Sequence, residues 1–321
     1  MDNKAVEAIA RSVRSLTIDA IQAANSGHPG MPMGMAELGA LLYGEVLRHD
    51  PADPQWPDRD RFVLSAGHGS MFLYSLFHLS GYGLPLEELK RFRQVGSKTP
   101  GHPEYGMTVG VETTTGPLGQ GLANAVGLAI AERMMGARFN TAEHQVVDHY
   151  TYAIAGDGCL MEGITSEASS LAGHLGLGKL VVFYDSNSIS IEGSTELAFT
   201  EDVAMRYRAY GWQVLEGDAY DPDGLRRLVE QAKAETGKPT LVVLTSVIGK
   251  GSPNKAGTHG VHGAALGDDE VALTKKEIGV DPAEMFYIDP AATQFFATYR
   301  SGLAGRRAEW QTALDAWSAS T

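Results

Sequence analysis

The first part of the chain alternates helical patterns with loop signals. Five apolar residues near the start follow one another at spacings of three and four, which predicts one apolar stripe of an amphipathic helix. They are Val6, Ile9, Val13, Leu16 and Ala20. The segment 25–30, with two Gly and one Pro, ends this pattern, and a second helical pattern follows over residues 33–47. A loop rich in Pro and Asp then covers residues 50–60.

Farther along, short apolar runs typical of strands alternate with helical patterns. The expected strands cover residues 61–65, 150–155, 179–184, 212–215 and 240–247. The expected helices cover residues 71–79, 160–175, 200–210 and 222–235, with Thr200 as the cap of the third. This alternation predicts an α/β fold with a mostly parallel sheet and helices on both faces. In such folds, ligands bind beyond the carboxyl ends of the strands.

The pattern changes near the C-terminus. Residues after Lys276 show no regular periodicity until a final helical pattern near residues 306–317. The sequence therefore predicts two parts. Residues 1–275 would form the ligand-binding domain, and residues 276–321 would form a C-terminal extension that resembles a linker between domains.

Composition and charge narrow the class of protein. With 321 residues, of which 43% are hydrophobic, the chain can bury a sizeable core. The net charge of -13 and the lack of a dense Lys/Arg run argue against nucleic-acid binding. Such a charge does not attract anionic substrates over a distance, so any phosphate must be recognised locally.

Cysteine usage and apolar runs bear on the compartment. Cys159 is the single cysteine, which excludes a disulfide within the chain. The N-terminus is polar, and no apolar run approaches the ~18–20 residues of a membrane-spanning helix. We therefore expect a cytoplasmic protein that enters no membrane and binds no nucleic acid.

Candidate chemistry begins with the tripeptide 156–158, Gly-Asp-Gly, at the end of one expected strand. Asn187 follows Asp157 by 30 residues and ends the next strand, so both side chains should meet at one edge of the sheet. Mg²⁺ prefers oxygen ligands and commonly shares one or two carboxylates with phosphates. The Asp157 carboxylate, the Asn187 amide oxygen and the Ile189 carbonyl fit that need, and Gly158 lets a diphosphate approach the backbone. Alone, the tripeptide would be an ordinary turn; the spacing and strand context favour a metal site.

These motifs, together with several Gly- and His-rich segments, resemble the transketolase family over the whole chain. Gly-Asp-Gly with a distant Asn is the thiamine-diphosphate fingerprint. The other matching segments are residues 26–30, 65–70, 101–104, 110–121, 189–193 and 259–263. The resemblance implies the thiamine-diphosphate-binding fold. It also implies thiamine diphosphate and Mg²⁺ (or Ca²⁺ or Mn²⁺ in its place) as cofactors.

The resemblance assigns roles to individual residues. The residues expected to contact the cofactor are His68, Gly116, Pro117, Leu118, Gly158, Asn187 and His262. His28, His102 and His262 would face the substrate and act in catalysis, with His28 and His262 binding it directly. Imidazole suits these roles because it donates hydrogen bonds and exchanges protons near neutral pH. Glu162, also a catalytic candidate, would lie at a dimer interface near the cofactor-activating glutamate of the facing domain.

Two loops mark the limits of the resemblance. The segment 119–124 lacks the third glycine of a dinucleotide fingerprint, which argues against a Rossmann dehydrogenase. Ala265 stands where relatives often have proline, and this change should affect loop stiffness more than chemistry.

The implied reaction is the transfer of a two-carbon ketol unit from a ketose phosphate to an aldose phosphate. Such a transferase serves the pentose phosphate pathway or the Calvin cycle. In the family, a glutamate on a second, pyrimidine-binding domain activates the cofactor, and that domain also supplies arginines for the substrate phosphate. We expect this chain to need a complementary C-terminal subunit or domain, within a homo- or hetero-oligomer, and to be inactive alone.

Several alternatives stay open. The chain is either one subunit of a split transketolase or an isolated domain of a longer enzyme. It could also belong to a related synthase, making deoxyxylulose phosphate or dihydroxyacetone. The histidine set favours the transketolase group over the deoxyxylulose-phosphate synthases. A non-catalytic cofactor-binding module is the remaining alternative, and the retained Asp157, Asn187 and four histidines argue against it.

Overall fold

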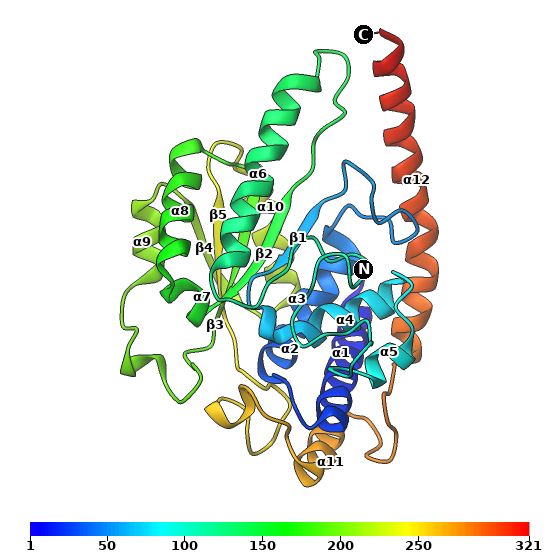
Figure 1. Ribbon diagram of the computed structural model, residues 1–321, viewed down its shortest axis with the longest axis vertical. Helices are drawn as coiled ribbons and strands as arrows, with labels where there is room; N and C mark the ends of the chain where they lie inside the picture. The colour runs from blue at the N-terminus through cyan, green and yellow to red at the C-terminus, as the bar shows by residue number, and fades with distance from the viewer. Residues whose placement is uncertain (321) are drawn as a thin grey trace.

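The computed structural model describes residues 1–320 and places five strands in one sheet at the centre of the molecule (Figure 1). The strands are β1 (Arg61–Leu64), β2 (Thr151–Gly156), β3 (Leu180–Ser186), β4 (Gln213–Asp218) and β5 (Thr240–Thr245). They pair in the order β1-β2-β3-β5-β4, and every pairing is parallel. The predicted α/β class with a parallel sheet is therefore confirmed.

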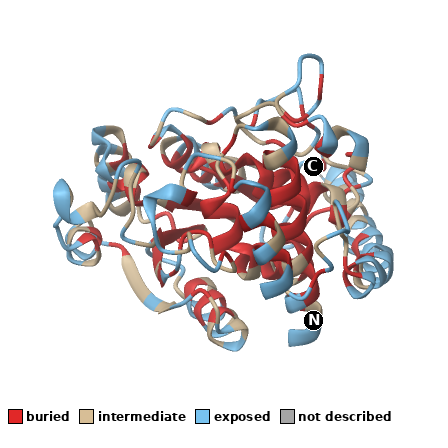
Figure 2. Cartoon of the chain, turned by 90° about the horizontal axis from the view of Figure 1, so that it is seen from below, coloured by how far each residue is buried: buried red, intermediate tan, exposed pale blue. Residues whose placement is uncertain are grey.

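Helices cover both faces of the sheet because successive side chains of each strand point to opposite sides. In β2, Tyr152 and Ile154 pack into one core and Ala153 and Ala155 into the other. The helices of the first core are α1 (Asn3–Ala24), α3 (Ala36–Leu41), α4 (Ser70–Ser80) and α10 (Pro222–Ala234). Those of the second are α6 (Gln120–Phe139), α7 (Asp157–Met161), α8 (Gly163–Leu175) and α9 (Val203–Ala209). Figure 2 shows the buried strands between these layers.

Several local predictions need correction. The helical pattern over residues 33–47 forms three pieces, α2 (Gly30–Gly34), α3 and a π-helix (Leu42–Val46). The helix expected over residues 160–175 is interrupted at Glu162, whose ψ of 137° is extended and separates α7 from α8. Thr200 is not the cap of α9. Asp202 is, because its carboxylate accepts the backbone N–H of Met205 at 2.8 Å.

The C-terminal part is more regular than the sequence indicated. After α11 (Asp268–Glu277), the helix α12 (Pro290–Ser320) runs for 31 residues along one side of the molecule (Figure 1). The expectation of irregular structure up to residue 306 was therefore wrong. Lys275 and Asp19, both fully buried, form an ion pair of 2.7 Å that joins α11 to α1. The division into residues 1–275 and 276–321 stays a prediction.

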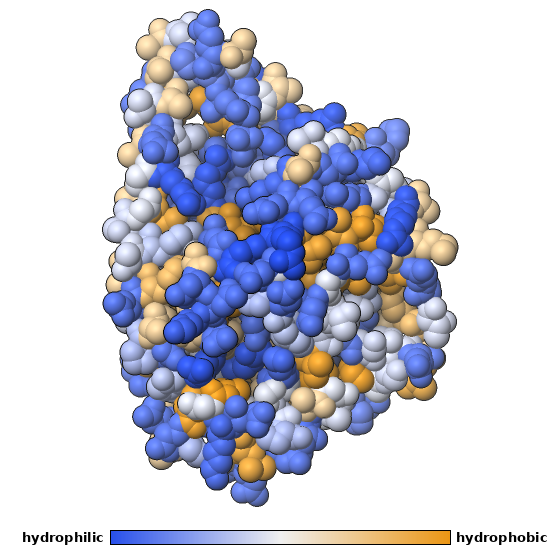
Figure 3. Space-filling model, turned by 180° about the vertical axis from the view of Figure 1, so that it is seen from behind, coloured by the Kyte–Doolittle hydropathy of each residue, from blue (hydrophilic) through white to orange (hydrophobic). Residues whose placement is uncertain are grey.

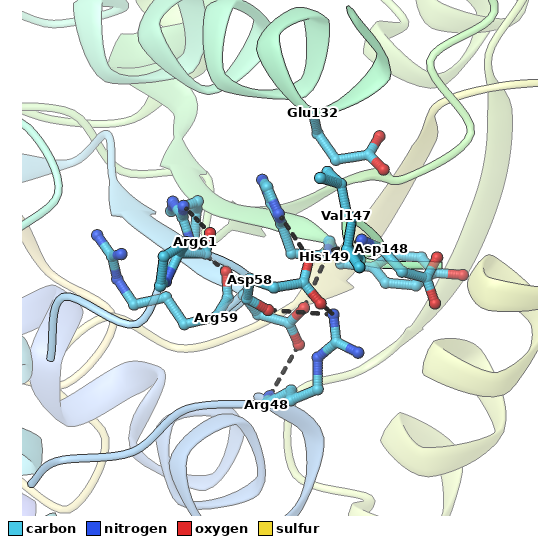
Figure 4. A network of polar contacts seen from close by, with 12 residues as sticks. Arg48, Asp58, Arg59, Arg61, Glu132, Val147, Asp148 and His149 are labelled. Atoms are coloured by element: carbon cyan, nitrogen blue, oxygen red, sulfur yellow. Dashed lines mark hydrogen bonds and ion pairs between the residues drawn. The ribbon is translucent and has the colours of Figure 1, made fainter. Parts of the chain in front are cut away.

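A network of buried polar groups joins the amino ends of β1 and β2 (Figure 4). Asp58 accepts a hydrogen bond of 2.7 Å from the Arg48 guanidinium, and its other oxygen lies 3.2 Å from His149 Nδ1. Asp60 accepts the backbone N–H groups of Arg48 and Tyr150, each at 2.8 Å. Each oxygen of the two carboxylates therefore has a donor. We call Arg48, Asp58, Asp60 and His149 the amino-end network.

The remaining elements are short. They are the helix α5 (Leu86–Lys90) and three 3₁₀ turns, Gly67–Gly69, Thr195–Leu197 and His259–Val261. On the face seen in Figure 3, apolar side chains gather in separate patches between hydrophilic ones. No helix within residues 1–320 combines the length and apolar character that crossing a membrane requires.

Candidate active site

A cavity of about 470 Å³ opens beyond the carboxyl ends of the strands. Ala66 lies just after β1, Gly156 ends β2 and Asp185 lies in β3, and all three line the cavity. The predicted site residues among its walls are His28, His68, Gly116, Leu118, Asp157, Gly158, Asn187, Ile189 and His262. Three predicted site residues, His102, Pro117 and Glu162, are not part of the lining.

The parallel pairing of β2 with β3 brings the candidate metal ligands to one edge of the cavity. Gly156 pairs with Asp185, so Asp157 and Asn187 follow from neighbouring strand ends. Asp157 is buried, and the Tyr184 hydroxyl donates to its Oδ1. Its Oδ2 is also buried, yet it makes no hydrogen bond within residues 1–320. A buried carboxylate oxygen without a donor is costly, so this position suits a bound cation.

The other candidate ligands leave room for a metal ion. The Asn187 amide oxygen accepts the Ile189 N–H at 3.0 Å, which leaves it a second lone pair. No cluster of three or more His, Cys, Asp or Glu side chains suited to a metal occurs within residues 1–320. A Mg²⁺ ion here would need further oxygens from a diphosphate, which is the usual coordination of this ion. The donor set of one carboxylate, one amide and one carbonyl therefore fits.

Asp185 is a second buried carboxyl at this edge. It accepts from the Ser246 hydroxyl and, at 3.1 Å, from the Asn187 amide. Burial, helped by the negative charge of Asp157, raises the pKa of Asp185 to about 6. Burial also raises the pKa of Asp157, against the hydrogen bond from Tyr184. Asp185 thus orients Asn187, a role that the sequence did not reveal.

Four histidines from distant parts of the sequence meet at the cavity, and three of them, His28, His68 and His262, line it. The His28 ring centre lies 5.1 Å from that of His68, 5.7 Å from that of His262 and 6.5 Å from that of His102. The His68 and His262 rings stack at 5.2 Å. The structure thus brings the four predicted histidines together, and we call them the histidine cluster.

Burial keeps the histidine cluster neutral, because it lowers the pKa of each ring. For His28 and His68, the repulsion between protonated rings lowers the pKa further. Burial and the charges of His262, Arg93 and His102 lower the pKa of His28 to about 4. Burial and the other three imidazoles lower the pKa of His68 to about 3. The pKa values of His102 and His262 are also lowered, chiefly by burial. At pH 7, each ring therefore presents one N–H donor and one acceptor.

The Gly116–Leu118 loop reaches the cavity because two glycines permit a close approach. A Cβ atom at Gly67 would lie 2.8 Å from the Gly116 nitrogen, closer than such atoms pack. Gly116 has a φ of 151°, which residues with side chains rarely adopt. Leu118 and Gly116 line the cavity, whereas Pro117 is exposed.

Glu162 lies apart from these groups. Its side chain is exposed on the extended link between α7 and α8, and it does not line the cavity. Exposed apolar side chains occur on the neighbouring helices, among them Met134 of α6, Met161 of α7 and Leu171 of α8. Whether Glu162 acts at an interface stays a prediction.

Several lining or supporting residues were not predicted from the sequence. Met31, Ile248 and His259 line the cavity, and Arg93 contacts His28. His259 belongs to the motif 259–263, so its position there was a usable signal. The sequence contains no such signal for Arg93 or Tyr184, because only the tertiary fold brings these residues to the site.

Comparisons with known proteins agree with this geometry. A family model described as "Transketolase, thiamine diphosphate binding domain" matches residues 5–321. The fold and cavity are thus those of a thiamine-diphosphate-binding domain. The chain belongs to the transketolase family, which confirms the resemblance in its motifs.

Individual relatives and solved structures support the assignment. The chain is 58% identical to the transketolase of Treponema pallidum over 99% of its length, and 61% identical to transketolase 1 of Escherichia coli over 84%. The transketolase structure from Leishmania mexicana is 50% identical with a TM-score of 0.96 over 98% of this chain. The structure of a transketolase complex with sedoheptulose-7-phosphate from Pichia stipitis is 47% identical with a TM-score of 0.96 over 98% of this chain.

The chain spans about half the length of these relatives. It covers 48% of the Treponema pallidum protein and 41% of the Escherichia coli one. It covers 47% of each of the two solved chains.

Proposed function

We propose that this chain provides the diphosphate-binding wall of a transketolase active site. With a complementary pyrimidine-binding domain, it would transfer a two-carbon ketol unit from a ketose phosphate to an aldose phosphate. One observation carries the proposal: a single cavity joins the buried Asp157 Oδ2, which has no donor within residues 1–320, to three neutral histidines, His28, His68 and His262. Metal-diphosphate binding and hydroxyl recognition are the two tasks that such an enzyme requires of this wall.

The metal edge would hold the cofactor. Thiamine diphosphate, when bound, supplies an electron sink for the two-carbon unit. Asp157, Asn187 and the Ile189 carbonyl would hold Mg²⁺ beside the diphosphate, with Gly158 leaving space for it. His68, Gly116, Leu118 and His262 are the further expected contacts, and Pro117 would contribute its backbone.

The histidine cluster would handle the sugar phosphate. Neutral imidazoles can exchange hydrogen bonds with several hydroxyls and can transfer protons. His28 and His262 would contact the substrate, and His102 would act from the edge of the cavity. The Pichia stipitis transketolase was solved as a complex with sedoheptulose-7-phosphate, and we expect a substrate of the same chemical class here.

A partner surface would complete the site. Met161, which precedes Glu162 in the chain, is exposed, as are Leu171 of α8 and Met134 of α6, and exposed apolar side chains commonly mark interfaces. By the family resemblance, the cofactor-activating glutamate comes from the facing domain. We therefore expect a homo- or hetero-oligomer in which Glu162 lies at the interface.

The test is an assay of the purified chain with thiamine diphosphate, Mg²⁺, a ketose phosphate and an aldose phosphate. We expect no ketol transfer from the chain alone. Adding the complementary half of a transketolase relative as a separate polypeptide should produce turnover. A rate near a typical ~10 s⁻¹ without the second polypeptide would refute the need for a partner. Cofactor binding without turnover in the mixture would favour a non-catalytic module.

A further inference from the structure

Arg93 lies beside His28 at the edge of the histidine cluster, in a loop after α5. Its φ of 61° lies in the left-handed region, which residues with side chains seldom adopt. The backbone N–H of Arg93 donates to the carbonyl of buried Thr99 at 3.0 Å, and the Thr99 hydroxyl in turn donates to the Glu88 carbonyl. Buried contacts thus hold Arg93 in an unfavourable conformation, as occurs often at functional sites.

Contacts with Ser26 and His28 fix the orientation of the Arg93 guanidinium. Nη1 donates to the Ser26 hydroxyl at 2.7 Å, and Nη2 lies 3.4 Å from His28 Nδ1. A Cβ atom at Gly101 would lie 3.0 Å from Arg93 Nε, so the absence of a side chain there admits the group. Arg93 forms no ion pair with a carboxylate within residues 1–320. The positive charge of Arg93 therefore lies next to the His28 imidazole, and no carboxylate of the described residues neutralises it.

This contact determines where His28 carries its proton. A guanidinium has only donors and stays charged, so it can approach a ring nitrogen only where that nitrogen is an acceptor. Nδ1 of His28 must then be unprotonated. Because His28 is neutral at pH 7, the single proton lies on Nε2. The Nε2 edge faces Gly263 of the cavity wall, where a Cβ atom would lie 3.2 Å away.

We propose that Arg93 is a positioning residue that holds His28 in the tautomer with the proton on Nε2. His28 then offers an N–H donor to an oxygen of the sugar phosphate and is not the base that removes a proton from it. This inference rests on the proposed function and narrows the role of one residue in it.

The other groups around His28 do not account for this tautomer. The rings of His68, His102 and His262 face it, and each is a neutral imidazole that can donate or accept. No hydrogen bond joins these rings to His28 within residues 1–320. Arg93 is the one neighbour in the described part of the chain whose charge and donor-only chemistry select a proton position.

The test is ¹⁵N NMR of the full chain with labelled histidine at pH 7, in which long-range correlations report the protonated nitrogen. Comparison with His28→Gln assigns the His28 signals. We expect wild type to show the proton on Nε2. In Arg93→Met, the tautomers should mix and the pKa of His28 should rise by about one pH unit, because a nearby positive charge is removed. Arg93→Lys keeps the charge and a donor, so it should restore most of the wild-type behaviour.

Arg91→Met is the matched control, because Arg91 is exposed in the same loop and should leave the His28 spectrum unchanged. A wild-type proton on Nδ1 would overturn the proposal even if Arg93→Met failed to fold. An unchanged tautomer in folded Arg93→Met would also overturn it. The spectra need no cofactor, partner or turnover, so their outcome is separate from that of the ketol-transfer assay.

Discussion

At the amino ends of β1 and β2, each carboxylate oxygen of Asp58 and Asp60 has a donor from the chain itself (Figure 4). At the carboxyl ends of β2 and β3, Asp157 leaves one buried oxygen without a donor within residues 1–320. Both ends of the strands bury carboxylates, but only at the amino end does the chain supply a hydrogen-bond donor for every oxygen of the carboxylates compared. The difference indicates that the amino end stabilises the fold, whereas the carboxyl end keeps its polar groups available for ligands.

The histidines sharpen the same contrast. His149 of the amino-end network lies against a carboxylate, whereas the rings of His68, His102 and His262 make no hydrogen bond within residues 1–320. These rings are half-buried, and a half-buried ring without a partner loses solvation and gains little from the chain. Variants at the two ends should therefore separate stability from activity.

The largest effect should come from the histidine cluster. Replacing His28 or His262 by Ala removes a positioned donor or acid–base group from a polar cavity and should lower turnover by about 10²–10⁴-fold. Urea unfolding should be nearly unchanged, because neither ring fills an apolar core. The assay uses the chain assembled with its complementary half. The exposed His174→Ala is the control, and near-wild-type rates in both site variants would contradict the assignment.

Variants of the amino-end network should lower stability and not affect catalysis directly. Asp58→Ala leaves the Arg48 charge and two donors without their acceptor, and we expect the free energy of unfolding to fall by about 3 kcal/mol. Glu216→Ala is the control because its pair with Arg208 is exposed, and it should cost under about 1 kcal/mol. Urea denaturation measures both. If the two variants lost the same free energy of unfolding, the buried pair would be no more stabilising than the exposed one.

Asp157→Asn should weaken cofactor binding while sparing the fold. The amide keeps an acceptor for Tyr184 but removes the charge, so thiamine-diphosphate affinity in Mg²⁺ should fall by about 10²-fold or more. The free energy of unfolding without ligands should not decrease, because an unpaired buried charge is lost. Titration calorimetry on the assembled enzyme measures the affinity. Unchanged affinity would show that the metal site lies elsewhere.

The smallest effect should be a pH dependence of stability. The pKa of His68 is about 3 in the fold and ~6.5 in the unfolded chain, so between pH 7 and 5 only the unfolded chain takes up its proton. Stability should therefore fall as the pH falls. His68→Gln should flatten this slope by about 1 kcal/mol per pH unit. Exposed His174→Gln should leave the slope unchanged, and equal slopes in all three chains would contradict the buried neutral state.

The sequence predicted the sheet well because strand and ligand signals are local. The expected strands 61–65 and 179–184 differ from β1 and β3 by no more than two residues at either end. The positions of Asp157 and Asn187 followed from the order of the strands alone. Gly-rich segments identified the histidines, since each lies in a loop motif that neighbouring residues define.

Features set by tertiary contacts could not be predicted. The 31 residues of α12 carry a weak apolar pattern, and only Ala292, Phe296 and Leu303 are buried. Thr200 and Asp202 both have side chains that cap helices, so the sequence pattern alone did not decide between them as the cap of α9. Arg93 is a single arginine without a motif, and its contact with His28 spans 65 residues of sequence.

The buried pair of Lys275 and Asp19 sets a practical limit on how far this domain can be trimmed for laboratory use. The Phe286 N–H donates to Asp19, and Lys275 donates to the Glu284 carbonyl. A protein shortened to residue 275 would keep both charges but lose these neighbours and admit water to the pair. A minimal cofactor-binding fragment should therefore extend beyond Asp289, whose carboxylate also pairs with an arginine of α1.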